Sequence, residues 1–224
     1  MKLSCHENQA TSGKETAMKT LSIIAITAFA FLALANFASA QDPQNDHFVL
    51  SSTTFENGAT LPPSTIYNYQ VSGQNVCSPD GSPGLDESPQ LSWRNAPRRT
   101  RSFVLIAFDV TGGFMHWGMY NIPSKTTELP ENAGIAGSSY GPQVVNAYGD
   151  LSYDGPCPPA STPPNDHEYV FTVYALDTDL TLPSYANFPT TALTLFRALV
   201  AAGRDGHILA SASITSYYSA TPTP

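Results

Sequence analysis

The sequence predicts a mainly β, sandwich-like domain. Three observations support this fold class. Short runs rich in apolar, β-branched and aromatic residues recur along the chain. Stretches rich in proline and glycine separate these runs, and only one segment has the spacing of an amphipathic helix. The sequence contains no internal repeat, and its length suits one domain with a sizeable core.

Two apolar segments, 102–109 and 116–123, form the centre of the predicted fold. The first is almost continuously apolar and rich in β-branched and aromatic residues, which is typical of a buried strand. A Thr-Gly-Gly link at 111–113 breaks the run before the second segment begins. The carboxylate of Asp109 and the imidazole of His116 are thereby predicted to lie at the ends of neighbouring strands.

The other elements follow in chain order. The segment 167–177 is apolar on both faces, so we expect it to be a central strand. Stretches 124–142 and 149–166 are expected to be irregular, the second being stiff because of its prolines. Shorter or more peripheral strands are expected at 48–50, 66–71, 91–93 and 207–218.

The single helix signal covers residues 190–202. Thr190 or Thr191 suits the N-cap, and Gly203 suits the left-handed position after the C-cap. Apolar residues at helical spacing indicate the buried side, and Arg197 is expected at the solvent edge. The predicted face consists of Leu193, Phe196, Arg197 and Val200.

The N-terminal segment has the pattern of a secretory signal peptide. An apolar run at 21–34 follows Lys14 and Lys19 and precedes Ala38-Ser39-Ala40, an A-x-A-type cleavage site. We therefore expect residues 1–40 to be removed, and residues 41–224 to form one secreted or periplasmic domain beginning near Gln41. An uncleaved anchor helix is the alternative, and Met18 is an alternative start.

Charge and cysteine content narrow the partners and the compartment. A net charge of −8 argues against nucleic acid, and against adsorption to or stable insertion into anionic membranes. Cys77 and Cys157 are the two cysteines after the cleavage site, and we expect them to form a disulfide. Closing so long a loop would stabilise the fold by about 4 kcal/mol. Two free thiols are the alternative.

Four side chains form the candidate site. Asp109, His116 and His167 stand at the ends of apolar strands, and Tyr169 shares a strand face with His167. If they converge, imidazole and phenol donors would face one pocket while the Asp orients one histidine. Such a pocket suits a small anion, above all phosphate or a phosphate monoester. We expect Gly155, Pro156 and Pro158 to form one wall.

Each of these residues also has a purely structural interpretation. A histidine at a strand end is often hydrogen-bonded for structural reasons, Asp109 could form the turn that follows it, and Tyr169 could belong to the core. Two histidines and one Asp could ligate zinc, although they lack a compact spacing. The segment 137–141 matches G-x-S-x-G but lacks the preceding strand and following helix of a hydrolase.

The order of several motifs resembles the phosphatidylethanolamine-binding protein family, in its bacterial and archaeal Raf-kinase-inhibitor-like branch. The resemblance covers residues 48–218. It implies an antiparallel β-sandwich with one or two short helices, and a small anion pocket near one end. Its motifs are SPQLSW at 88–93, the segments 102–109 and 116–123, ELP at 128–130, YDGPCPP at 153–159, and 167–177.

The resemblance also implies roles for individual residues, and this sequence departs from the family's motifs at two places. The pocket positions of the family correspond here to Asp109, His116, His167 and Tyr169, with the loop 155–159 as one wall. The family's D-P-D-x-P motif is reduced to DVTGG, which would leave a more open pocket. The family's common H-R-Y motif reads H-E-Y here, at residues 167–169. The interaction that the family's arginine makes is therefore missing or changed.

We therefore expect an exported, monomeric or weakly dimeric protein without a cofactor or catalytic activity. Its ligand would be a small anion, such as phosphate, a carboxylate or a phospholipid head group. Two other functions stay open at this point. The protein could be a secreted inhibitor that acts on a protease or kinase target, or a phosphoester hydrolase using His116 or His167 as acid and base.

Overall fold

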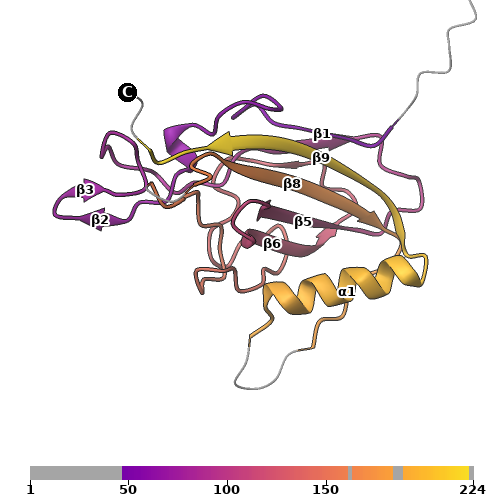
Figure 1. Ribbon diagram of the computed structural model, residues 1–224. Helices are drawn as coiled ribbons and strands as arrows, with labels where there is room; N and C mark the ends of the chain where they lie inside the picture. Colours follow the sequence, from indigo (N-terminus) through magenta and orange to yellow (C-terminus); the bar gives the residue numbers. More distant parts are fainter. Residues whose placement is uncertain (1–46, 161–162, 184–188, 222–224) are drawn as a thin grey trace, which may run out of the picture. The chain divides into compact units, whose positions relative to one another are not determined.

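The computed structural model describes residues 47–160, 163–183 and 189–221 (Figure 1). The chain divides into two units, 1–42 and 43–224, and the described residues all belong to the second. The expected signal peptide at 1–40 and the cleavage point near Gln41 lie outside the described residues. Within the described part, every helix is too short or too polar to cross a membrane.

The centre of the domain is a four-stranded antiparallel sheet in the order β6-β5-β8-β9 (Figure 1). The two middle strands, β5 (Ser102–Asp109) and β8 (His167–Leu176), match the predicted buried segments. Their side chains are mostly buried on both faces, which explains why these segments lack a polar face. The flanking strands are β6 (Phe114–Pro123) and β9 (Ile208–Tyr218).

A smaller antiparallel sheet packs on one face of the central sheet and completes the sandwich. It contains β1 (Val49–Ser51), β4 (Leu91–Arg94) and β7 (Glu128–Leu129), in the order β1-β4-β7. Trp93 of β4 meets Phe103 of β5 with ring centroids 5.1 Å apart, in the core between the sheets. The predicted sandwich is confirmed, although β7 falls in a segment expected to be irregular.

The other face of the central sheet is covered by the helix α1 (Ala192–Arg204) (Figure 1). Thr191 caps its N-terminus: its side chain accepts a hydrogen bond from the backbone N–H of Thr194. The buried side of the helix consists of Leu195, Leu199 and Ala202, which pack in a second core cluster with Val104 and Ile106. The two core clusters therefore lie on opposite faces of one sheet.

The predicted buried face is wrong for two of its residues, and the predicted end of the helix is wrong as well. Phe196 packs against the second core cluster and Arg197 is exposed, both as expected. Leu193 and Val200 are 56% and 72% exposed. The segment 192–202 is apolar nearly all round, so spacing alone does not distinguish one stripe from the next. The helix also continues through Gly203, and the left-handed conformation falls on Gly206 at φ +78°.

The predicted strand at 66–71 is reduced to a two-residue strand. A 3-10 turn, η1 (Pro63–Thr65), precedes it, and a small hairpin joins β2 (Gln70–Val71) to β3 (Gln74–Asn75). The backbone of 66–67 bonds to loops instead of a strand, because Asp86 N–H donates to the Ile66 carbonyl and Tyr67 N–H donates to that of Pro156.

Cys77 and Cys157 form a disulfide that joins two loops 80 residues apart in sequence. Their Cα atoms lie 4.4 Å apart. The Tyr218 hydroxyl of β9 donates a hydrogen bond of 2.8 Å to the Cys77 carbonyl, which ties the same loop to the central sheet. The disulfide and this bond fix the irregular segments at one end of the sandwich.

Candidate functional site

A cavity of about 200 Å³ lies at the end of the central sheet. The four polar residues singled out in the sequence all line it, although they come from three strands. Phe114 and Tyr148 complete the lining, together with residues of the loop around Cys157. The full lining consists of Asp109, Phe114, His116, Tyr148, Cys157, Pro158, Pro159, His167 and Tyr169.

Strand register explains why these side chains meet. Asp109 at the end of β5 pairs with Phe114 on β6 and with Tyr169 on β8. Directly opposed residues in an antiparallel sheet project to the same face. His167 lies two residues before Tyr169 and therefore projects to that face as well. The site is thus a direct product of the pairing among the three strands.

His116 reaches the cavity through a β-bulge. The pairing of β5 with β6 passes from Ala107 opposite Trp117 to Phe108 opposite Met115, which leaves His116 as the extra residue. Regular alternation would send His116 and Trp117 to opposite faces. The bulge lets His116 line the cavity while Trp117 fills the core between the two sheets.

Asp109 has two roles at once. Its Oδ2 atom accepts a hydrogen bond of 2.7 Å from Nδ1 of His167, so the carboxylate orients that imidazole. Its Oδ1 atom accepts from the backbone N–H groups of Thr111 and Gly112, at 2.9 and 2.8 Å. A Cβ atom on Gly112 would lie only 2.8 Å from Oδ2, so the turn needs glycine there. The histidine-orienting and turn-forming interpretations therefore both hold.

His116 is held in a defined tautomer. Its Nδ1 lies 2.7 Å from the backbone carbonyl oxygen of Asp154, which can only accept, so Nδ1 carries the proton. Burial lowers the pKa of His116 below its usual 6.5 and keeps the imidazole neutral. Its other nitrogen, Nε2, therefore presents a lone pair. The prediction that this ring donates to an anion requires a second proton.

Tyr169 supplies a hydroxyl that lacks a partner. The side chain is 2% exposed, and the hydroxyl makes no hydrogen bond within residues 47–160, 163–183 and 189–221. Burial, and then the charge of Asp109, raise the pKa of Tyr169, so the phenol keeps its proton. Leaving a buried hydroxyl unpaired costs free energy. The hydroxyl is itself covered, so a ligand oxygen in the cavity reaches it only when the lining side chains shift slightly.

The predicted wall differs in detail. Pro158 lines the cavity as expected, with Cys157 and Pro159, whereas Gly155 and Pro156 are buried behind it and do not. Gly155 serves packing: a Cβ atom there would collide with the Thr65 carbonyl oxygen.

Two lining residues escaped the sequence analysis. Phe114 shares the strand and face of the predicted site residues, so its position two residues before His116 could have indicated it. Tyr148 comes from an irregular loop, and no sequence pattern points to it.

A pair of acidic side chains lies behind this wall. The Gly155 N–H donates a hydrogen bond of 2.7 Å to Oδ1 of Asp86, and the Asp154 carboxylate accepts from Asn146. Burial is the main cause that raises the pKa of Asp86 to about 7; the hydrogen bond from the Gly155 N–H works against the rise, and the negative charge of Asp154 adds to it. The folded protein therefore prefers the protonated form of Asp86.

Asp86→Asn should stabilise the protein in a pH-dependent manner. The raised pKa means that the folded state retains a proton which the unfolded state loses above about pH 4, so ionisation costs stability as pH rises. The gain from Asn should grow between pH 4 and 7 and level off above, at about 1 kcal/mol after screening of this partly exposed group. Urea denaturation at pH 4 and pH 8 measures it.

Asp166→Asn is the matched control, because it removes one exposed carboxylate elsewhere. It should change stability little at either pH. An equal effect of Asp86→Asn at pH 4 and pH 8 would contradict the assigned ionisation of Asp86.

The geometry gives little support to the two alternatives, zinc binding and serine hydrolase activity. Among the described residues, no group of three or more His, Cys, Asp or Glu side chains is placed to hold a metal ion. The G-x-S-x-G segment at 137–141 lies in turns and leads to an isolated bridge at Gln143. The strand and helix of a nucleophile elbow do not flank it.

Comparisons with known proteins agree with this architecture. Residues 51–219 match the sequence model of the phosphatidylethanolamine-binding protein family. The UPF0098 protein of Aquifex aeolicus is 35% identical over 178 residues, covering 75% of this chain and 85% of that protein. The crystal structure of Escherichia coli YbcL, which is described as a new member of the mammalian family, matches with a TM-score of 0.61 and 27% sequence identity. The match covers 77% of this chain and 98% of YbcL. The crystal structure of a family homologue from Chlamydia trachomatis matches with a TM-score of 0.58 and 29% sequence identity. The match covers 77% of this chain and 97% of the homologue.

Proposed function

Because the chain belongs to the phosphatidylethanolamine-binding protein family, we propose that it is an exported, non-catalytic binding protein for a small anion. The ligand would be a phosphate-bearing or carboxylate group in the cavity at the end of the central sheet. The observation that carries this proposal is the convergence of Tyr169, His116 and the hydrogen-bonded Asp109–His167 pair on one cavity.

The size of the cavity limits the ligand. Sites for drug-sized molecules usually have volumes of about 300 to 1,000 Å³. The cavity has about 200 Å³ and suits a group of the size of phosphate or acetate. A phospholipid would therefore insert only its head-group phosphate and leave the rest outside.

Anion binding is coupled to proton uptake in this proposal. The Tyr169 hydroxyl is a donor at any physiological pH, because its pKa is raised. His116 donates from Nε2 only as the imidazolium, because Nδ1–H is already engaged by the Asp154 carbonyl. The anion compensates the charge of that imidazolium in a buried setting, so binding should bring a proton with it.

The disulfide supports export. Disulfides persist in secreted and periplasmic proteins and are rare in the cytosol. Cys77 and Cys157 join two loops of the described domain, and Cys157 lines the cavity itself. An oxidising compartment would therefore preserve the wall of the binding site.

Tyr169→Phe tests the proposal. The variant keeps the ring and removes only the hydroxyl, whose bond to a charged oxygen is worth about 1.5 kcal/mol, or roughly a tenfold change in affinity. Phosphate affinity should fall about tenfold in calorimetric titration. Thermal stability should stay equal or rise slightly, because the hydroxyl has no partner in the unliganded protein.

Tyr174→Phe is the matched control. Tyr174 lies on the same strand, but it packs against the core under the helix, on the opposite face. It should leave phosphate affinity unchanged. Unaltered affinity in Tyr169→Phe would refute the assigned donor, and absence of phosphate binding by the unmodified protein would refute the function. Release of phosphate from phosphoethanolamine, followed by phosphorus NMR, would contradict a non-catalytic role.

A further inference from the structure

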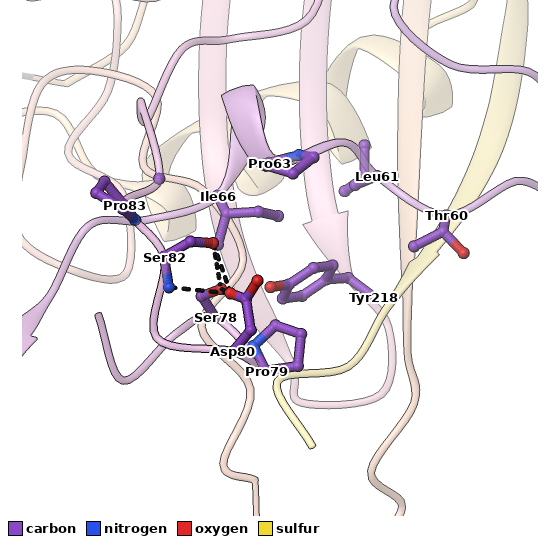
Figure 2. A pocket seen from close by; sticks show the side chains of 11 residues that line it. Thr60, Leu61, Pro63, Ile66, Ser78, Pro79, Asp80, Ser82, Pro83 and Tyr218 are labelled. Carbon is purple, nitrogen blue, oxygen red and sulfur yellow. Dashed lines mark hydrogen bonds between the residues drawn. The ribbon is translucent and has the colours of Figure 1, made fainter. Parts of the chain in front are cut away.

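A second cavity, of about 430 Å³, lies between the loop that follows Cys77 and the end of β9 (Figure 2). Its walls are mainly apolar: Leu61, Ile66 and Pro79 contribute side chains, and the ring of Tyr218 closes one side. No residue of the anion cavity lines it, and no lysine, arginine or histidine lines it. Its volume falls within the usual range for sites of small organic molecules.

Of the residues that the structure describes, Asp80 is the one charged residue that lines this cavity. Its Oδ1 atom accepts hydrogen bonds from the Ser78 hydroxyl at 2.7 Å and from the backbone N–H of Ser82 at 2.9 Å, and a third from the Ser82 hydroxyl (Figure 2). These bonds lower the pKa of Asp80 to about 2, so the carboxylate stays ionised at physiological pH. Its Oδ2 atom makes no hydrogen bond within the described part of the chain.

Tyr218 presents a second acceptor at the same end of the cavity. In Figure 2 its hydroxyl points toward the carboxylate of Asp80. The hydroxyl donates its proton to the Cys77 carbonyl at 2.8 Å, which leaves its oxygen lone pairs available. Burial, and then the negative charge of Asp80, raise the pKa of Tyr218 to about 12, so it remains a neutral phenol.

We propose that this cavity is a second ligand site, which takes a small organic cation with a primary ammonium group on an apolar or aromatic stem. The ammonium group carries three N–H donors, and the cavity offers it the free Oδ2 of Asp80 and the Tyr218 oxygen. The stem packs against Leu61, Ile66 and the Tyr218 ring. The absence of a basic residue among the lining leaves the carboxylate for the ligand.

The site is held in shape without a ligand. Cys77 is bonded to Cys157, and the Tyr218 hydroxyl binds the Cys77 carbonyl on the loop that carries Asp80. Pro79 stiffens the same turn. A preformed loop lowers the entropy cost of binding, so a small molecule need not order the loop itself.

The test compares phenethylamine with 2-phenylethanol, which keeps the aromatic stem and replaces the ammonium by a neutral hydroxyl. Titrations followed by amide NMR should show shifts at residues 78–84 and at Tyr218. Phenethylamine should bind about fivefold more tightly than the alcohol, as expected for one exposed ion pair. Asp80→Asn, which retains the acceptor for Ser78 and Ser82, should reduce the amine affinity to that of the alcohol.

Two controls make the result specific. Glu56→Gln removes an exposed charge outside the cavity and should leave the amine affinity unchanged. Tyr169→Phe should also leave it unchanged, so failure of the anion proposal is distinguishable from failure of this one. Equal binding of amine and alcohol, shifts mapping elsewhere, or unaltered amine affinity in folded Asp80→Asn would each overturn the proposed site.

Discussion

Replacing Cys77 and Cys157 together by serine should lower the free energy of unfolding by about 4 kcal/mol. The disulfide closes a loop of 80 residues, and the loss of so long a constraint raises the entropy of the unfolded chain. The two loops joined by the disulfide make few strand hydrogen bonds. They therefore depend on the disulfide for a constraint that backbone pairing supplies in the sheets. Urea denaturation of the double variant and of the oxidised protein measures the difference.

Ser124→Ala is the control, because it alters an exposed residue outside both disulfide-linked loops and should leave the stability unchanged. Adding a reductant to the unmodified protein should reproduce the stability of the double variant. The double variant should also bind phosphate more weakly, since Cys157 lines the anion cavity. A difference in unfolding free energy below about 1 kcal/mol would contradict this structural role of the disulfide.

Anion affinity should rise by up to about tenfold for each unit by which pH falls between the pKa of His116 in the complex and its lower pKa in the free protein. Burial lowers the pKa of His116 in the free protein below 6.5, and a bound anion would raise it. Between those two values the complex holds one proton more than the free protein, so affinity increases as pH decreases. The affinity stops rising at pH values low enough for His116 to be protonated already in the unliganded protein.

Sulfate is the better probe for this dependence, because it remains a dianion across the range whereas phosphate itself titrates. His116→Gln should remove most of the pH dependence. His207→Gln is the matched control: His207 is half-exposed, bonds Asp177 and precedes the other end of β9. Affinity for sulfate that is independent of pH would contradict the neutral, Nδ1-protonated state assigned to His116.

Local sequence patterns predicted the strands that carry the site. The segments 102–109 and 167–177 are apolar on both faces, and a strand buried between two layers requires that composition. Their polar ends then had to lie near the rim of the sheet. Asp109, His167 and Tyr169 could be placed together on this basis, because strand alternation and one pairing register determine their faces.

Other features depend on long-range contacts that no local pattern records. The bulge at His116 arises from a shift in pairing between β5 and β6, so alternation alone assigns His116 the wrong relation to Trp117. The backbone at 66–67 bonds to loops distant in sequence, which overrides its alternating pattern. The place of Tyr148 in the cavity and the cavity beside Asp80 likewise follow from loop packing.

The central claim is that the cavity takes up an anion together with a proton on the buried imidazole of His116. Calorimetric titration of the protein with sulfate at pH 6, in two buffers of different ionisation enthalpy, counts the protons directly. The account predicts saturable binding with net proton uptake of up to one proton per sulfate, lost in His116→Gln. Absence of binding, or binding with the same heat in both buffers, would contradict it.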